Sequence, residues 1–67
     1  MRPQRITVNY ANGTTAIFRA LFDARNDLLI LNRHLDFLKP DLCLDVDGIQ
    51  VTITGINDRR VYLERNQ

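Results

Sequence analysis

The sequence has few of the side chains from which catalytic and metal sites are built. Its 67 residues include no serine, one cysteine, Cys43, and one histidine, His34. Nucleophilic catalysis needs a nucleophile beside a base, and His34 with Cys43 is the only such pair; we favour a structural cysteine. A single cysteine excludes an intramolecular disulfide, and these two residues cannot supply a Cys/His zinc set. We therefore predict a protein that is not an enzyme and has no cofactor.

Two other kinds of ligand site have weak support in the sequence. Four aspartates gather in one stretch, at positions 36, 41, 45 and 47. Their spacing does not match a calcium loop, which needs ligands at alternate positions and a closing glutamate, so we interpret them as solvated residues and predict no metal. The three glycines are too far apart to form a phosphate-binding loop.

Charge and hydropathy limit the classes of partner that the protein is expected to bind. The net charge is +1, and the arginines are scattered along the chain, at positions 2, 5, 19, 25, 33, 59, 60 and 65. A nucleic-acid binder usually concentrates its basic residues, so we expect no nucleic-acid partner. No apolar run approaches the roughly 20 residues that span a bilayer, and the first residues lack the apolar stretch of a signal peptide. We expect a cytoplasmic protein without a membrane partner.

The chain length indicates one small domain, residues 1–67, with a mobile start over residues 1–4. A chain this short buries only about 60% of the surface that its unfolded form exposes, so its stability is marginal. Neither a disulfide nor a zinc site is available to stabilise the fold. We therefore expect an oligomeric or partner-bound working state.

The first third of the chain indicates a β-hairpin. Apolar and polar residues alternate from Ile6 to Tyr10, as in a half-buried strand. Asn12-Gly13 tolerates the positive φ angles of a tight turn, so we predict that Thr14 to Phe22 folds back as the second strand.

Residues 14 to 38 have two interpretations. Their apolar residues are spaced three and four apart, which would suit one long amphipathic helix ending before Pro40. The pair Ile17-Phe18 and the polar stretch Asp23 to Asp27 favour strands and a loop. We prefer a second strand, a loop, a third strand over Leu28 to Asn32 and a short helical turn over Arg33 to Leu38.

The last third indicates a second hairpin. Apolar residues alternate with others on both sides of Asp47-Gly48, a tight-turn pair. Gly55 predicts a bulge, residues 57–59 a turn and residues 61–63 a last strand. The aromatic residues lie at core-pattern positions: Tyr10, Phe18, Phe22, Phe37 and Tyr62. We predict a mostly β fold, a small antiparallel β-barrel or sandwich of about six short strands with one short helical turn.

Four segments carry a resemblance to a known family: a strand running into Ala20-Leu21-Phe22-Asp23, a strand leading to Phe37-Leu38-Lys39-Pro40-Asp41, the hairpin from Leu42 to Ile53, and the strand Val61 to Glu64. In these the chain resembles the lambda-like head-to-tail joining and tail attachment proteins of long-tailed phages. It departs from them in having no N-terminal helical segment. The long excursion that follows the second strand in that family is reduced here to Arg25-Asn26-Asp27.

The resemblance implies a function in phage or prophage virion assembly. Such proteins form a β-barrel that caps the portal of a DNA-filled head and presents a surface to the tail. Their partners would be portal or connector proteins and tail subunits, and the chain would self-associate into a ring, first in the host cytoplasm and then in the virion. Charged rims would be the recognition device.

A second resemblance points to another class of protein. Residues 29–33, 51–56 and 60–63 look similar to the carbon storage regulator family of dimeric RNA-binding proteins. The Gly-Glu pair that this family has soon after the arginine is absent here, as are a further strand and a helix. An RNA-binding post-transcriptional regulator is therefore an alternative, and a small inhibitor that binds a host protein is another.

The residues that we predict to contact partners are those that the core does not need. They lie at the start of the chain, in the polar stretch after the second strand and at the last turn: Arg2, Arg5, Asp23, Arg25, Asn26, Asp27, Asp58, Arg59 and Arg60.

Overall fold

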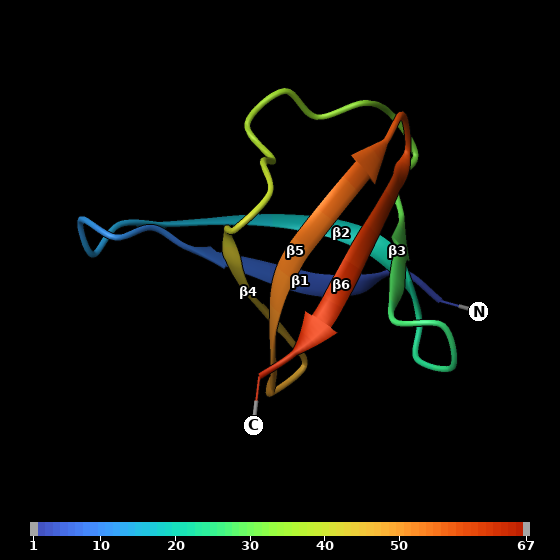
Figure 1. Ribbon diagram of the computed structural model, residues 1–67, viewed down its shortest axis with the longest axis horizontal. Helices are drawn as coiled ribbons and strands as arrows, with labels where there is room; N and C mark the ends of the chain where they lie inside the picture. The colour runs from blue at the N-terminus through green and yellow to red at the C-terminus, as the bar shows by residue number, and fades with distance from the viewer. Residues whose placement is uncertain (1, 67) are drawn as a thin grey trace.

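The computed structural model describes residues 2–66, which form six strands and no helix. The strands are β1 (Gln4–Asn9), β2 (Thr15–Asp23), β3 (Leu28–Ile30), β4 (Cys43–Val46), β5 (Ile49–Asn57) and β6 (Arg60–Arg65). All neighbours are antiparallel, and the strands form a closed barrel in the order β1-β2-β3-β6-β5-β4, because β1 pairs with both β2 and β4 (Figure 1). The predicted antiparallel β-barrel is confirmed, and the alternative of one long helix over residues 14 to 38 is wrong.

The tight turns form where the sequence predicts them. Gly13 has a φ of 88°, and the Asn12 side-chain oxygen accepts a hydrogen bond of 3.0 Å from the Thr14 amide. Asp47 and Gly48 both have positive φ, 52° and 87°, which is the backbone of a type I′ hairpin turn. These turns join β1 to β2 and β4 to β5, so that strand alternation places the same residues inside as the sequence pattern does.

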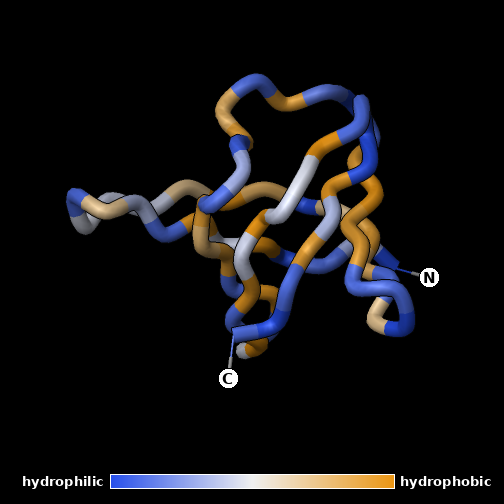
Figure 2. The backbone as a smooth tube through the Cα atoms, viewed as in Figure 1, coloured by the Kyte–Doolittle hydropathy of each residue, from blue (hydrophilic) through white to orange (hydrophobic). Residues whose placement is uncertain are grey.

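The core is filled by inward-facing aliphatic residues from all six strands. The largest side chains with no exposure are Ile6, Val8, Leu29, Leu44, Val46, Val51, Ile53 and Val61. In Figure 2 the turns are largely hydrophilic, whereas β3 is hydrophobic along its whole length. The register between β5 and β6 shifts between Ile53 and Gly55, which is the predicted bulge.

The helical turn predicted over Arg33 to Leu38 is wrong. The Leu38 amide donates to the Leu35 carbonyl at 3.4 Å, and no helix extends this single turn. The segment is fixed at both ends, because the Leu31 amide donates to the Arg59 carbonyl in the β5–β6 turn and the Asp41 amide donates to the Ile53 carbonyl in β5. It must cross the end of the barrel in few residues, and an extended path spans more distance per residue than a helix does. The buried side chain of Leu38 packs against the core on the way.

Two of the five aromatic residues predicted at core positions lie outside the core. Phe37 is 38% exposed and Tyr62 is 40% exposed. Phe37 stands on the crossing segment with its ring edge-on to Phe18, at a centroid distance of 5.9 Å. Tyr62 faces outward because its neighbours Val61 and Leu63 take the inward positions of β6.

Gln4, the last residue of the stretch predicted to be mobile, is the first residue of β1 and pairs with Ala20. Met1 lies outside the described residues.

Candidate functional site

A groove crosses the outside of the barrel between β2 and the chain that follows β3. Its central part has a volume of about 440 Å³ and is lined by Pro3, Arg19, Ala20, Leu21, Ile30, Leu31, Asn32 and Arg59. A hollow of about 380 Å³ shares Arg19 and Asn32 with it, and another of about 320 Å³ at the β5–β6 turn shares Ile30 and Arg59. Because the three hollows share lining residues, they adjoin. We call the whole the arginine groove.

Four arginines line the arginine groove: Arg19, Arg33, Arg59 and Arg60. Arg5 lies directly opposite Arg19 in the β1–β2 ladder, and both are exposed. The only carboxylate in the lining is Asp58. Within residues 2–66 the ion pairs are Arg65–Asp27 and His34–Asp36, so the groove arginines have no carboxylate partner there. The fold thus gathers basic residues that are scattered in the sequence, and the groove is suited to an anionic partner.

The floor of the arginine groove is aliphatic. Leu21 and Ile30 face each other across the β2–β3 ladder, and both are half-buried. Ile17, which lines the neighbouring hollow, is 62% exposed and is the most exposed large hydrophobic residue that the structure describes. A partner that fills the groove would bury this apolar surface as well as meet the arginines, and apolar burial contributes about 25 cal/mol per Å².

The predicted contact residues fall into two groups. Asp58, Arg59 and Arg60 line the groove, Arg5 adjoins it, and Arg2 is exposed immediately before the lining residue Pro3. The remaining predicted residues are Asp23, the last residue of β2, and residues 25–27 of the β2–β3 loop, which lies at the opposite end of β3 (Figure 1). The structure therefore does not bring the two groups together.

Sequence reasoning missed Arg19 and Arg33 as groove residues. Arg19 had a usable signal, because it occupies the outward position between Ile17 and Leu21 in a predicted strand. The Asn12-Gly13 turn also fixes the register that sets it opposite Arg5. Arg33 had no such signal, because it lies on the segment between β3 and β4, part of which the sequence predicts as a helical turn.

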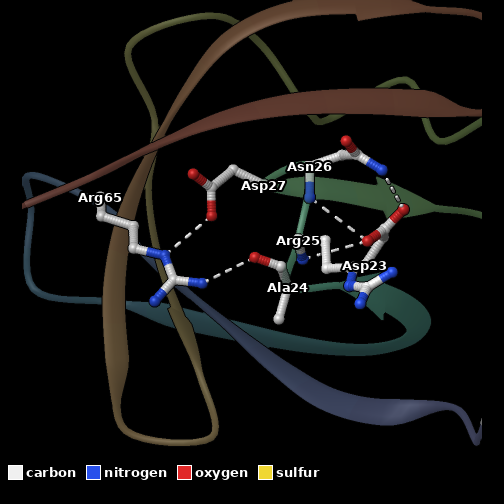
Figure 3. Close-up of polar contacts among 6 residues, drawn as sticks. All are labelled: Asp23, Ala24, Arg25, Asn26, Asp27 and Arg65. Carbon is white, nitrogen blue, oxygen red and sulfur yellow. Dashed lines mark hydrogen bonds and ion pairs between the residues drawn. The ribbon is translucent and has the colours of Figure 1, made fainter.

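The β2–β3 loop is held by its own polar groups (Figure 3). The Asp23 carboxylate accepts hydrogen bonds from the Arg25 amide at 3.1 Å, the Asn26 amide at 3.3 Å and the Asn26 side chain at 2.8 Å. The Asn26 side chain is the main cause of a lowered pKa of Asp23, and the two amides and the charge of Arg25 act in the same direction. These bonds favour the ionised form of Asp23 and hold the loop closed.

Arg65, near the end of β6, ties this loop to the barrel. Its Nε donates to the Asp27 carboxylate at 2.7 Å, and its Nη2 donates to the Ala24 carbonyl at 2.9 Å (Figure 3). The acidic groups of the loop are therefore already bonded within the molecule, whereas the groove arginines have no such partner among residues 2–66.

His34 and Cys43 have separate surroundings. The His34 ring contacts the Asp36 carboxylate at 3.0 Å and the Asp58 carbonyl at 3.4 Å. Cys43 is exposed at the start of β4, as expected if Leu44 faces the core. Among the described residues no group of three His, Cys, Asp or Glu side chains could hold a metal ion, and none of these residues forms a helix long and apolar enough to cross a membrane.

Comparison with protein-family models, with curated proteins and with solved structures finds no match for this chain.

Proposed function

We propose that this protein is a phage or prophage virion assembly protein that connects head and tail through protein–protein contacts. The observation that carries the proposal is the contrast between a filled core and an open groove outside it. The core consists of buried apolar side chains, whereas the exterior has an aliphatic floor beside four arginines. The resemblance of the hairpins to lambda-like joining proteins supplies the specific role.

In this role the exterior of the barrel is the working part. Arginine is favoured in protein interfaces because its planar group bonds carboxylates in pairs and packs on apolar surface. Complementary charge speeds the encounter and fixes the orientation, which an assembly step requires. The partners would be portal or connector proteins on one side and tail subunits on the other, with several copies of this chain forming a ring.

Deletion of the gene from an inducible prophage that carries it tests the role. We expect lysates with filled heads and separate tails, and joined virions after expression of the intact chain from a plasmid. Expression of a variant with Arg19→Glu and Arg59→Glu should leave heads and tails separate, because the charge of the arginine groove is reversed. Lysates of the deletion strain with normal numbers of joined virions would contradict the proposal.

The gathering of arginines also favours a second candidate, an RNA-binding regulator. Its affinity for RNA would fall steeply with salt, because bound phosphates release counterions. The aliphatic floor argues for a protein partner, since surfaces that bind single strands commonly stack bases on exposed aromatic rings. The only aromatic residue in the lining is Phe18, which is half-buried. A gel shift with RNA at several salt concentrations would distinguish the two.

A further inference from the structure

The edge of β2 beside the arginine groove has no neighbouring strand. β1 covers one side of β2 from Thr15 to Ala20, but β3 pairs only with Leu21 to Asp23. After Ile30 the chain leaves the sheet, and residues 31–42 cross the end of the barrel instead of continuing along β2. A longer β3 would have occupied this place. Its early end leaves a gap in the barrel wall, and the groove lies along that gap.

The hydrogen-bond pattern shows which main-chain groups face the gap. In an antiparallel ladder, alternate residues of a strand direct their N–H and C=O groups to opposite neighbours. The Tyr10 amide donates to the Thr14 carbonyl at 3.0 Å. Because the pattern alternates along the ladder, the N–H and C=O groups of the even-numbered residues of β2 face β1. The odd-numbered residues Thr15, Ile17 and Arg19 therefore face the gap. Among the described strands, only β1 pairs with these residues, and it does so on the other side of β2.

The side chains of these edge residues point outward. Thr15, Ile17 and Arg19 are exposed, whereas Phe18 and Ala20 turn toward the core. An extended segment placed on this edge would meet donors and acceptors at strand spacing, Ile17 as an apolar neighbour and Arg19 as a cation. Arg33 and Arg59 would flank it from the other side of the groove.

We propose that the arginine groove receives an extended acidic segment of a partner protein, which adds to β2 as a further strand. Main-chain bonds to Thr15, Ile17 and Arg19 would provide affinity, as in other strand-addition complexes. Cross-strand pairing requires an aliphatic residue opposite Ile17 and an Asp or Glu opposite Arg19, hence two positions apart in the partner. This inference deepens the proposed function by naming the chemistry of the partner.

Nitrogen-15 NMR of the full chain with a short peptide tests the inference. In the peptide, valine and glutamate alternate at every second position, with threonine between them. We expect shifts of the amide signals of residues 15–19 and 32–35. Two control peptides should bind at least about tenfold more weakly. One has lysine for glutamate and meets like charges; the other has proline for valine, because in an antiparallel pair the residue opposite Ile17 donates its N–H to β2.

Two pairs of variants separate main-chain and charge contributions. Ile17→Pro removes an N–H that faces the gap and that the fold does not use, whereas Ile17→Thr keeps it. Arg19→Glu reverses a groove charge, whereas Lys39→Glu makes the same change on the crossing segment. We expect the first member of each pair to weaken peptide binding about tenfold relative to the second. Signal dispersion in the spectra of the free variants verifies that each is folded.

The inference is overturned if the peptide binds without shifting residues 15–19, or does not bind at all. It is also overturned if an oligouridine shifts these signals and the peptide does not, since the groove would then serve nucleic acid. Shifts at this edge that grow with protein concentration alone would mean that a second copy of the chain fills it. Head-to-tail joining is scored in the prophage and peptide binding in solution, so either can fail without the other.

Discussion

Aspartate is the residue that shapes the loops of this barrel. Asp27, Asp41, Asp47 and Asp58 all have positive φ, between 50° and 73°. A short side chain that bonds nearby main-chain groups makes aspartate one of the few residues that tolerate this conformation. The four aspartates at positions 36, 41, 45 and 47 therefore include two with a structural use, because Asp41 and Asp47 hold such backbone positions.

Asp45 stabilises the β4–β5 hairpin through its side chain. Its carboxylate accepts a 2.7 Å bond from the Gly48 amide and a 2.7 Å bond from the Gln50 side chain. We expect Asp45→Ala to lower the free energy of unfolding by about 1 kcal/mol, the usual size for such bonds at a partly exposed site. Urea denaturation measures this value. Asp36→Ala is the matched control and should change it little, because the one polar side-chain contact of Asp36 among residues 2–66 is with His34 at a surface position.

The lowered pKa of Asp23 predicts how the β2–β3 loop responds to acid. A carboxyl group whose pKa is lowered by folding stabilises the fold above its ordinary value of 3.8, and this stabilisation is lost as pH falls through the lower value of the folded state. We expect Asn26→Ala to raise the pKa of Asp23 toward 3.8, because it removes the largest cause of the shift. NMR titration of the Asp23 carboxyl measures it. A variant with an unchanged pKa would refute this cause, and Asn32→Ala, on the crossing segment, should have no effect.

At the scale of elements, the turn between β4 and β5 depends on its glycine. Gly48 has a φ of 87°, whereas Gly55, in the bulge of β5, has no positive φ. A Cβ at either position meets no close atom, the nearest being Tyr62 Cδ2 at 3.9 Å from position 55. We expect Gly48→Ala to destabilise the protein by about 1 kcal/mol and Gly55→Ala to change stability less, which thermal unfolding measures. Equal effects would mean that φ is not the cause.

The elements that the sequence predicts well are those that local chemistry determines. Asn12-Gly13 and Asp47-Gly48 specify turns by themselves, and strand alternation then assigns each side chain to the inside or the outside. The segment from Arg33 to Leu38 was predicted wrongly because its leucines, Leu35 and Leu38, have helical spacing. Their burial is set by the need to cover the end of the barrel, which is a tertiary requirement that spacing does not reveal.

The arginine groove could be predicted only in part, for a similar reason. The sequence predicts Arg59 and Arg60 as contact residues because they lie at a turn, but nothing local links them with Arg19 or Arg33. They share a groove because β3 pairs with β2 on one side and β6 on the other. Strand order in a barrel is set by which distant pairings close the ring, and this information is not carried by any one segment.

At the scale of the whole molecule, stability depends on a single small core. A domain of this length has a free energy of unfolding of about 3 to 10 kcal/mol. Leu44 is fully buried where β4 closes the barrel between β1 and β5. We expect Leu44→Ala to cost about 2 to 5 kcal/mol, which is a large fraction of that free energy. Ile17→Ala, outside the core, should change stability by less than about 0.5 kcal/mol.

Circular dichroism during urea titration measures both variants. Leu44→Ala should lose its β spectrum at much lower urea than the parent, and Ile17→Ala should follow the parent. A folded and equally stable Leu44→Ala protein would contradict the closed core described for residues 2–66.

The early end of β3 links the stability of the protein in a cell to the concentration of its partner. A segment that fills the gap beside β2 binds the folded chain alone, so it shifts the folding equilibrium in proportion to its concentration relative to its dissociation constant. For a domain of marginal stability, that shift determines how often proteases meet an open chain. Copies in excess of their partner would be degraded first, and the abundance of this protein would be matched to that of the molecule it serves.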